Sequence, residues 1–277
     1  MTNSRWANFK KQPNTLVGGS LMAVAMFTAL LGIFYTPYDP IAIDFNQRLT
    51  APSLTHWLGT DEWGRDVLSR LMSGAVVSIG VALSTSMTAT AVGAFVGATV
   101  GFFGGWLDKW AMALVDALLA FPSIILALAV VAILGASPYT PVLALSVAYF
   151  PSVVRIVRSS VLSLKRNDFV HASTVMGNSR LFTLLRHILP NTLGTAIVLA
   201  TSLFGWALLA ESALSFLGLG VPPPESSWGG MLSDSRNYFE NAPWLAIAPG
   251  LALSFSLLGI NLFGDALRDL NDPRMSA

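Results

Sequence analysis

Six apolar stretches recur along the chain, separated by polar segments. A helix that crosses the hydrocarbon layer of a membrane needs about 20 mostly apolar residues, and the first stretch, from Thr15 to Tyr35, carries no charge. It is long for the apolar region of a signal peptide and lacks a small-residue cleavage site, so we expect a retained first span. The pattern predicts further spans at residues 75–103, 109–135, 139–160, 192–217 and 243–264.

Basic residues provide an independent test of this topology, because Lys and Arg collect in short cytoplasmic segments. With the N-terminus inside, twelve basic residues are cytoplasmic and only Arg48, Arg65, Arg70 and Arg236 are external. We therefore predict a multi-pass protein with both termini in the cytoplasm. The predicted segments are a cytoplasmic N-terminus (1–14), a first helix (15–37), an external segment (38–74), a five-helix core (75–264) and a cytoplasmic C-terminus (265–277).

Composition supports an integral membrane protein. Hydrophobic residues make up 53 % of the 277 residues and charged residues only 11 %, whereas soluble domains carry about 25 % charged residues. The net charge of +1 argues against a nucleic-acid partner and leaves membrane lipid as the expected surroundings. Because the chain has no cysteine, disulfides and thiolate metal sites are excluded. The expected fold class is all-α and polytopic, with six transmembrane helices and an ordered external loop region.

Small residues form a stripe on the second predicted span. Gly93, Gly97 and Gly101 repeat every four residues, so they lie on one helix face. Such a face lets a neighbouring backbone approach closely, and we expect it to pack against protein. The alternative is the general abundance of glycine in membrane helices.

Two external segments are rich in turn-forming residues. The segment 38–74 contains five acidic residues, three arginines, Pro40, Pro52 and a Gly59-Thr60-Asp61 turn, so we expect an ordered cap there. The segment 218–242 contains three consecutive prolines, which favour an extended and stiff conformation. This second segment either closes the mouth of a cavity, receives a partner or acts as a rigid linker.

The cytoplasmic segment 165–190 predicts two short helices. In the first, Asn167 or Asp168 is the expected cap, the side chains of Phe169, Ala172, Ser173 and Met176 share one face, and Gly177 ends the helix. The second starts at Asn178 or Ser179, has apolar positions at helical spacing and is closed by Pro190. The two helices either bind another protein or lie on the anionic inner leaflet.

At this loop the sequence resembles a known family, the inner-membrane permease subunits of bacterial ABC importers. The segment His171-Ala172-Ser173, Gly177 and Leu189-Pro190 is similar in type and spacing to the family's cytoplasmic loop. His171 stands where the family usually has Glu and His187 where it usually has Ile. The first departure removes the basis for a salt bridge from that position to an ATPase, and leaves the spacing intact.

Further motifs resemble the dipeptide, oligopeptide and nickel permeases, in particular the "C"-type subunit of the two that pair. They cover nearly the whole chain, from Asp39 to Pro273. They are Asp39-Pro40, Leu58-Gly59-Thr60-Asp61, Gly64-Arg65-Asp66, Asp116 with Phe121-Pro122, Glu211-Ser212-Ala213-Leu214-Ser215-Phe216-Leu217-Gly218, and Gly264-Asp265-Ala266-Leu267-Arg268-Asp269 with Asp272-Pro273.

The resemblance implies a type I importer permease and a division of labour. No glycine precedes any of the four lysines, so the chain has no phosphate-binding loop of the Gly-Lys-Ser/Thr kind. We expect a transport subunit and not an enzyme, with no catalytic residue or cofactor on this chain, and with ATP and Mg²⁺ on partner subunits. The implied partners are a second, homologous permease, two cytosolic ATPases and an extracytoplasmic substrate-binding protein, in the bacterial inner membrane. The implied ATPase-coupling residues are Phe169, Val170, His171, Ala172, Ser173, Met176, Gly177, Leu189 and Pro190.

Two acidic residues are candidates for the translocation path. Asp116 and Glu211 are the acids nearest the membrane interior, where a buried charge is costly and indicates function. Each can instead pair with a basic residue or a backbone amide near the end of a span. A metal site is not expected, because His171 and His187 lack a helical ligand spacing and His56 lies across the membrane. The competing function is an ion-coupled secondary transporter, while the cargo, a peptide, nickel or another small solute, is left open.

Overall fold

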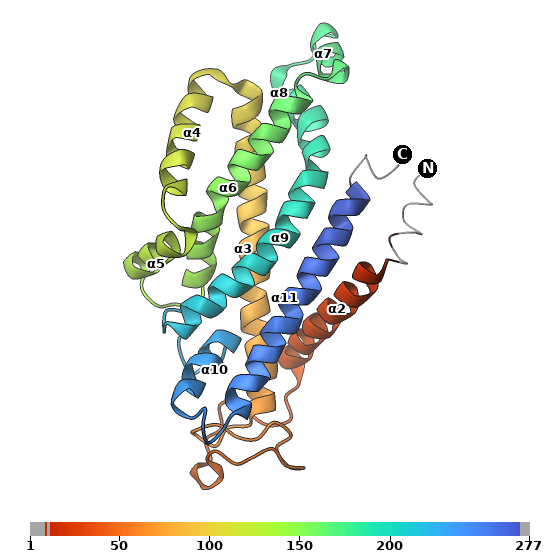
Figure 1. The fold of residues 1–277 in the computed structure, drawn as a ribbon. Helices are drawn as coiled ribbons and strands as arrows, with labels where there is room; N and C mark the ends of the chain where they lie inside the picture. Colours follow the sequence, from red (N-terminus) through yellow and green to blue (C-terminus); the bar gives the residue numbers. More distant parts are fainter. Residues whose placement is uncertain (1–8, 10–11, 272–277) are drawn as a thin grey trace.

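The computed structural model describes residue 9 and residues 12–271. Within these residues five long helices are apolar enough to cross a membrane, and they form one elongated bundle (Figure 1). Arg5, Lys10, Lys11, Arg274 and the predicted Pro273 motif lie outside the described residues. The five helices are α2 (Pro13–Phe34), α3 (Val67–Phe103), α6 (Thr140–Leu164), α9 (Leu189–Phe216) and α11 (Trp244–Asn271).

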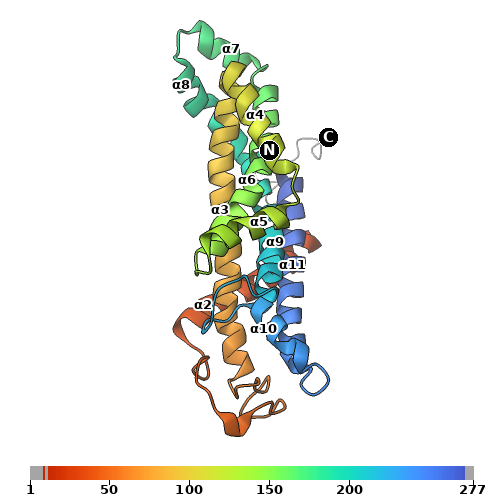
Figure 2. The same cartoon turned by 90° about the vertical axis from the view of Figure 1, so that its left-hand side faces the viewer.

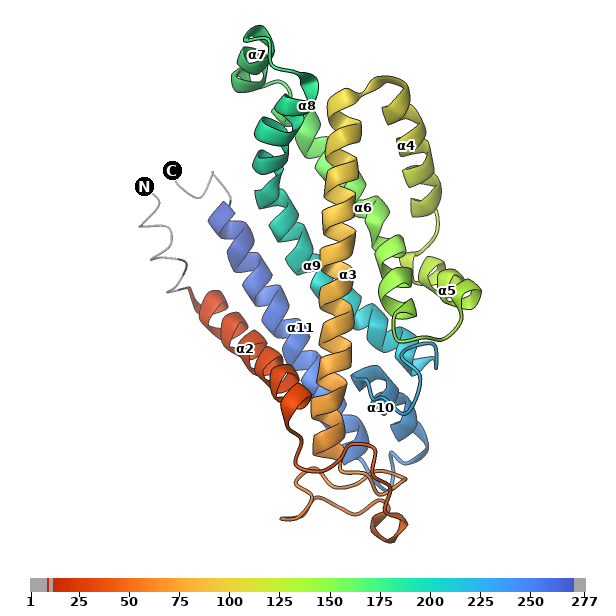
Figure 3. The same ribbon diagram turned by 180° about the vertical axis from the view of Figure 1, so that it is seen from behind.

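Helix α3 is the central element and runs the length of the bundle (Figure 3). Its 37 residues span about 55 Å at the usual rise of an α-helix. The sequence placed the start of this span at residue 75, whereas the helix begins at Val67. The cause is a local cap: the Asp66 carboxylate accepts a hydrogen bond from the Ser69 N–H at 2.8 Å. The last eight residues of the predicted external segment 38–74 are therefore helical.

The third predicted span, 109–135, is wrong as a single helix. The structure has α4 (Gly105–Leu119) and α5 (Ser123–Leu134), bent against each other by 93°. Pro122 explains the break, because proline has no backbone N–H and disfavours helical backbone at the preceding residue, Phe121. The predicted six spans hold only if this bent pair counts as one. Figure 2 shows the pair beside the long helices.

Glycines allow the closest helix contacts of the bundle. A Cβ added at Gly97 would lie 2.6 Å from the carbonyl oxygen of Val154, and one at Gly93 would lie 2.7 Å from Cβ of Val153. A Cβ at Gly101 would lie 3.1 Å from the carbonyl oxygen of Arg158. The predicted stripe is thus the surface on which α3 meets α6.

A second glycine seam escaped the sequence analysis. Gly18 of α2 would place a Cβ 2.6 Å from the Phe263 backbone nitrogen, and Gly259 of α11 would place one 2.9 Å from Leu21 Cβ. Neither glycine has another glycine four residues away, so no repeat marks them. They let α2 pack directly on α11.

The ends of the last helix also differ from the prediction. Helix α11 continues to Asn271, beyond the expected limit at residue 264, so the predicted cytoplasmic C-terminus 265–277 begins inside a helix. Between α9 and α11, the predicted external loop 218–242 contains the short helix α10 (Trp228–Asp234) and a 3₁₀ turn, η3 (Ser235–Asn237). The external segment before α3 holds only η1 (Phe45–Gln47) as helical structure.

Candidate coupling loop and translocation surface

The first cytoplasmic helix, α7 (Asp168–Val175), ends as its sequence predicts. Gly177 has a φ of +81°, its N–H donates to the carbonyl of Thr174 at 3.0 Å, and the Asn178 N–H donates to the carbonyl of Ser173 at 3.2 Å. This pair of bonds is the Schellman arrangement, which needs left-handed backbone at the position after the helix. Asn167 precedes the helix as predicted, although its side chain makes no capping bond.

The predicted helix face is divided between two environments. Val170 and Ser173 are buried, whereas Phe169, Ala172 and Met176 are exposed. The Ser173 hydroxyl lies 2.9 Å from that of Thr183 and accepts a bond from the Asn178 amide at 3.2 Å. Ser173 is therefore the buried member of the predicted face, because its hydroxyl bonds with the following segment.

The second cytoplasmic helix is not separate from the fifth span. Helix α8 (Arg180–Thr183) passes through a π-helical turn, η2 (Leu184–Ile188), directly into α9. Pro190 was expected to end this helix, but it lies in the first turn of α9. Pro190 has no backbone N–H to donate, and the wider π turn accommodates it. The Leu189 N–H donates to the carbonyl of Leu184. The side-chain amide of Asn191 donates to the carbonyl of His187 at 2.6 Å.

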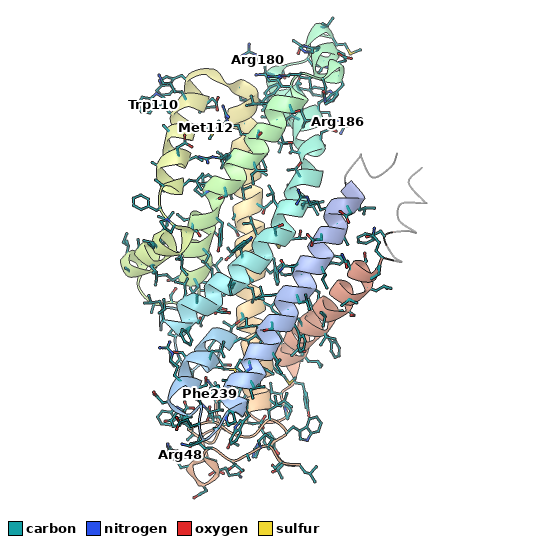
Figure 4. The ribbon with its side chains drawn as sticks, in the orientation of Figure 1. Arg48, Trp110, Met112, Arg180, Arg186 and Phe239 are labelled. Carbon is teal, nitrogen blue, oxygen red and sulfur yellow. The ribbon has the colours of Figure 1, made fainter. Side chains whose placement is uncertain are left out.

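Apolar side chains are exposed at the tip of this loop, together with basic ones. Val175 is 88 % exposed and Met176 80 % exposed. Arg180 and Arg186 lie at the same end of the bundle (Figure 4). The other exposed apolar residues of the tip are Phe169, Leu181, Phe182 and Leu185.

The base of the loop belongs to the core of the bundle. Val170, Leu184 and Ile188 are buried in one apolar cluster with side chains of α3 and α6, such as Ala98 and Val157. A displacement of the loop therefore meets closely packed side chains that connect it to three long helices.

The two histidines of the loop occupy different surroundings. His171 is exposed, while the ring of His187 lies 5.7 Å from that of Phe182 and 6.5 Å from that of Phe169. Among the described residues no group of three or more His, Cys, Asp or Glu could hold a metal ion.

Asp116 lies on the surface of the bundle and forms an ion pair with Arg155 of α6. Both side chains are more than half exposed, although Arg155 lies nine residues before the end of α6, about 14 Å along the helix. A neighbouring pair joins Arg158 to Asp108, with Nη2 2.6 Å from Oδ2. An exposed ion pair at this depth faces protein or an aqueous cavity and not lipid.

Glu211 has no exposed surface. Its carboxylate accepts a hydrogen bond from the Ser215 hydroxyl at 2.6 Å, and the hydroxyls of Ser78 and Ser227 also bond to it. Since Ser227 caps α10 by accepting from the Gly230 N–H, the buried carboxylate joins α3, α9 and α10. Glu211 therefore faces serines in this conformation, whereas the Asp116 side chain is exposed on the surface of the bundle.

Comparison with known proteins shows the family of the chain. Residues 89–277 match the family described as the binding-protein-dependent transport system inner membrane component. A putative peptide transport system permease protein of Brucella suis biovar 1 is 40 % identical over 94 % of this chain and 87 % of its own length. The chain belongs to this family of permeases.

Two other relatives are similar to the permease over nearly its whole length. A dipeptide transport system permease protein of Alkalihalophilus pseudofirmus is 40 % identical over 97 % of this chain and 88 % of the relative. A glutathione transport system permease protein of Escherichia coli O1:K1 is 37 % identical over 98 % of this chain and 89 % of the relative. The resemblance seen in the sequence is confirmed, and so are the all-helical fold and the role of a transport subunit without enzymatic activity.

The external end of the permease is organised by Asp61, which the sequence analysis noted only as part of a turn. Its carboxylate accepts from the N–H groups of Trp63 and Arg65 at 2.8 and 2.9 Å and from Arg65 Nε at 2.7 Å. Arg70 Nε lies 3.3 Å away. Asp66 binds His56 Nδ1 at 2.9 Å. The Gly59-Thr60-Asp61 turn indicates an ordered segment, but the sequence pattern did not show that Arg65 and Arg70 bind Asp61.

Proposed function

We propose that this permease subunit forms half of a translocation pathway for short peptides, with a homologous subunit as the other half. The relatives reported above are named for peptides, a dipeptide and glutathione, and these names support a peptide cargo over nickel. Membership of the family supports a broader statement. The permease works in a binding-protein-dependent importer together with ATPase and substrate-binding partners. ATP and Mg²⁺ bind to the two ATPases, and both termini of the permease lie in the cytoplasm of a bacterial inner membrane.

The segment 165–190 is the proposed docking element for the ATPases. The observation that supports it is the combination of an exposed apolar tip, with Val175 and Met176, and a base packed between α3, α6 and α9. An apolar tip without a partner is unfavourable in water, and a helix on the inner leaflet would not need this packed base. A partner that grips the tip can shift the bundle between two packings, because packed helices exchange between discrete arrangements.

Asp116 and Arg155 are proposed to face the pathway. Their exposed pair joins α4 to α6, about 14 Å along α6 from its last residue. An ion-coupled secondary transporter is disfavoured, because the chain belongs to the family of binding-protein-dependent transport components, whose transport is driven by partner ATPases.

Replacement of the tip residues tests the proposed docking. The variants Val175→Glu and Met176→Glu place a charge where an apolar contact is expected, so peptide uptake driven by ATP should fall by about tenfold or more. Both positions are exposed, so the amount of inserted protein should stay unchanged. The readouts are uptake in proteoliposomes and co-purification of the ATPases.

The matched control is Leu54→Glu, which introduces the same charge at an apolar residue that is 96 % exposed at the opposite end. It should leave ATPase association unchanged. Normal uptake and association in both tip variants would refute the docking role of this loop.

A further inference from the structure

A cavity of about 770 Å³ opens at the external end of the bundle, beside α10. Small-molecule sites usually enclose about 300–1,000 Å³. Ile41, Ile43 and Trp63 of the external segment line one part of it, and the proline run 222–224 lines another. The proline-rich segment thus forms part of a cavity wall, one of the roles expected from the sequence.

Three carboxylates line this cavity, and none of them has a close hydrogen bond to a basic side chain among the described residues. Glu62 has Arg65 Nη2 at 3.6 Å and Asp234 has Arg70 Nη2 at 3.7 Å, and both distances exceed a hydrogen bond. Glu225 is exposed and has no ion pair. The carboxylates therefore keep their acceptor capacity for a ligand.

The two arginines of the cavity bind mainly to Asp61, which lies outside it. Arg65 Nε is 2.7 Å and Arg70 Nε 3.3 Å from the same Asp61 oxygen. The Arg70 side chain is only 6 % exposed, and its Nη1 has no hydrogen-bond partner. The charge of this buried guanidinium is thus incompletely paired, so a carboxylate that a ligand brings to the cavity side of Arg70 would be favourable.

Nearby cations compensate the negative charges of Glu62 and Asp234 only in part. Removal from water raises the pKa of the Glu62 carboxyl and that of the Asp234 carboxyl. At Glu62 a backbone hydrogen bond opposes the rise in pKa and the neighbouring Asp61 adds to it, whereas at Asp234 the charges of Arg70 and Arg65 oppose it. An ammonium group placed between the carboxylates would lower their pKa values, and each carboxylate would attract it.

We propose that this cavity binds short zwitterionic peptides, with the free amino terminus at Glu62, Glu225 and Asp234 and the terminal carboxylate at the Arg70 guanidinium. The inference rests on the proposed function, because short peptides are the proposed cargo. It adds a solute site at the external end of this subunit that recognises both peptide termini.

Protection of an introduced thiol tests the site, since the chain has no cysteine of its own. In the variant Val221→Cys the thiol lies in the cavity wall, and a membrane-impermeant maleimide labels it in nanodiscs that hold the whole transporter. Dialanine at about ten times its dissociation constant should slow labelling about tenfold. N-acetyl-dialanine, which lacks the ammonium, and dialanine amide, which lacks the carboxylate, should protect far less.

Variants of the carboxylates extend the test. Glu62→Gln, Asp234→Asn and Glu225→Gln should each weaken protection by dialanine, and Glu240→Gln, at an exposed acid outside the cavity, should not. An unchanged labelling rate without peptide shows that a variant keeps its fold. Glu225 is exposed, so its loss cannot act through unfolding. A thiol at Thr55, on the other side of the external segment, should react equally with and without peptide.

Equal protection by all three compounds, or none by dialanine, would overturn the proposed site. ATP-driven uptake of dialanine, measured with the same purified transporter in proteoliposomes, separates this result from the transport function. Uptake without protection refutes the cavity alone. A wild-type preparation that takes up no peptide refutes the proposed function.

Discussion

The two ends of the bundle are held together by different forces. At the external end, Asp61 and Asp66 are nearly fully buried and bind Arg65, Arg70 and His56 at 2.7 to 3.3 Å. At the cytoplasmic end, no ion pair involves residues 168–188, and the loop is attached through apolar contacts and a few hydroxyl bonds. A directional polar network defines one arrangement, whereas apolar contacts permit others. The difference fits a rigid external cap and a cytoplasmic loop that moves with a partner.

The largest effect is expected from the centre of the external network. Asp61→Asn removes the charge that compensates Arg70 and Arg65, and breaking a buried pair by removing one partner costs about 3–5 kcal/mol. We expect a large loss of folded protein in detergent, measured by thermal unfolding. Glu240→Gln, an exposed external acid, is the control and should leave the melting temperature unchanged. A fully stable Asp61→Asn protein would contradict the idea of a rigid cap.

A smaller loss of stability is expected from a change in the glycine contact between α3 and α6, because α3 connects the two ends of the bundle. Gly97→Ala places a methyl group against the Val154 carbonyl, and overpacking of this kind costs about 1–3 kcal/mol. Gly80→Ala is a matched change on the same helix, where an added Cβ meets nothing within 4 Å. It should be neutral or slightly stabilising, because alanine favours the helix. Equal unfolding midpoints for the two variants would refute the close seam between α3 and α6.

At the cytoplasmic end, Gly177→Val should separate stability from coupling. Valine at a φ of +81° costs on the order of 1 kcal/mol, and nothing lies within 4 Å of the added Cβ. The variant should insert normally and lose ATP-driven uptake, because the end of α7 is displaced. Gly177→Asn, which tolerates left-handed backbone better, should retain more uptake. Normal transport by Gly177→Val at normal abundance would remove this turn from the coupling element.

The smallest effect concerns pH at the external cavity. Burial raises the pKa of Glu62 above its usual value, so the folded protein binds this proton more tightly than the unfolded chain. Glu62→Gln should therefore be more stable than the wild type at neutral pH. The advantage should shrink as the pH falls through the raised pKa toward the ordinary value, as followed by unfolding at several pH values. An advantage that grows on acidification would give the opposite sign and contradict the burial effect.

Several features of the site were predictable because they depend on neighbouring residues. The turn at Gly177, the glycine stripe and the uncharged first span each follow from residues a few positions apart. Other features needed contacts between distant residues. The inward turn of Ser173 depends on Thr183, the burial of Glu211 depends on Ser78 and Ser227, and Pro190 is tolerated because a π turn precedes it.

The sequence by itself determined that this chain is an all-helical membrane protein, because span length and turn chemistry are local properties, and its motifs showed the resemblance to permeases. Only the tertiary structure decided which glycines touch which helix and which acids are buried or exposed. It also brought Glu62 and Asp234, 172 positions apart, to one cavity. These outcomes depend on packing between helices and on exclusion of water, and no window along the chain contains both partners.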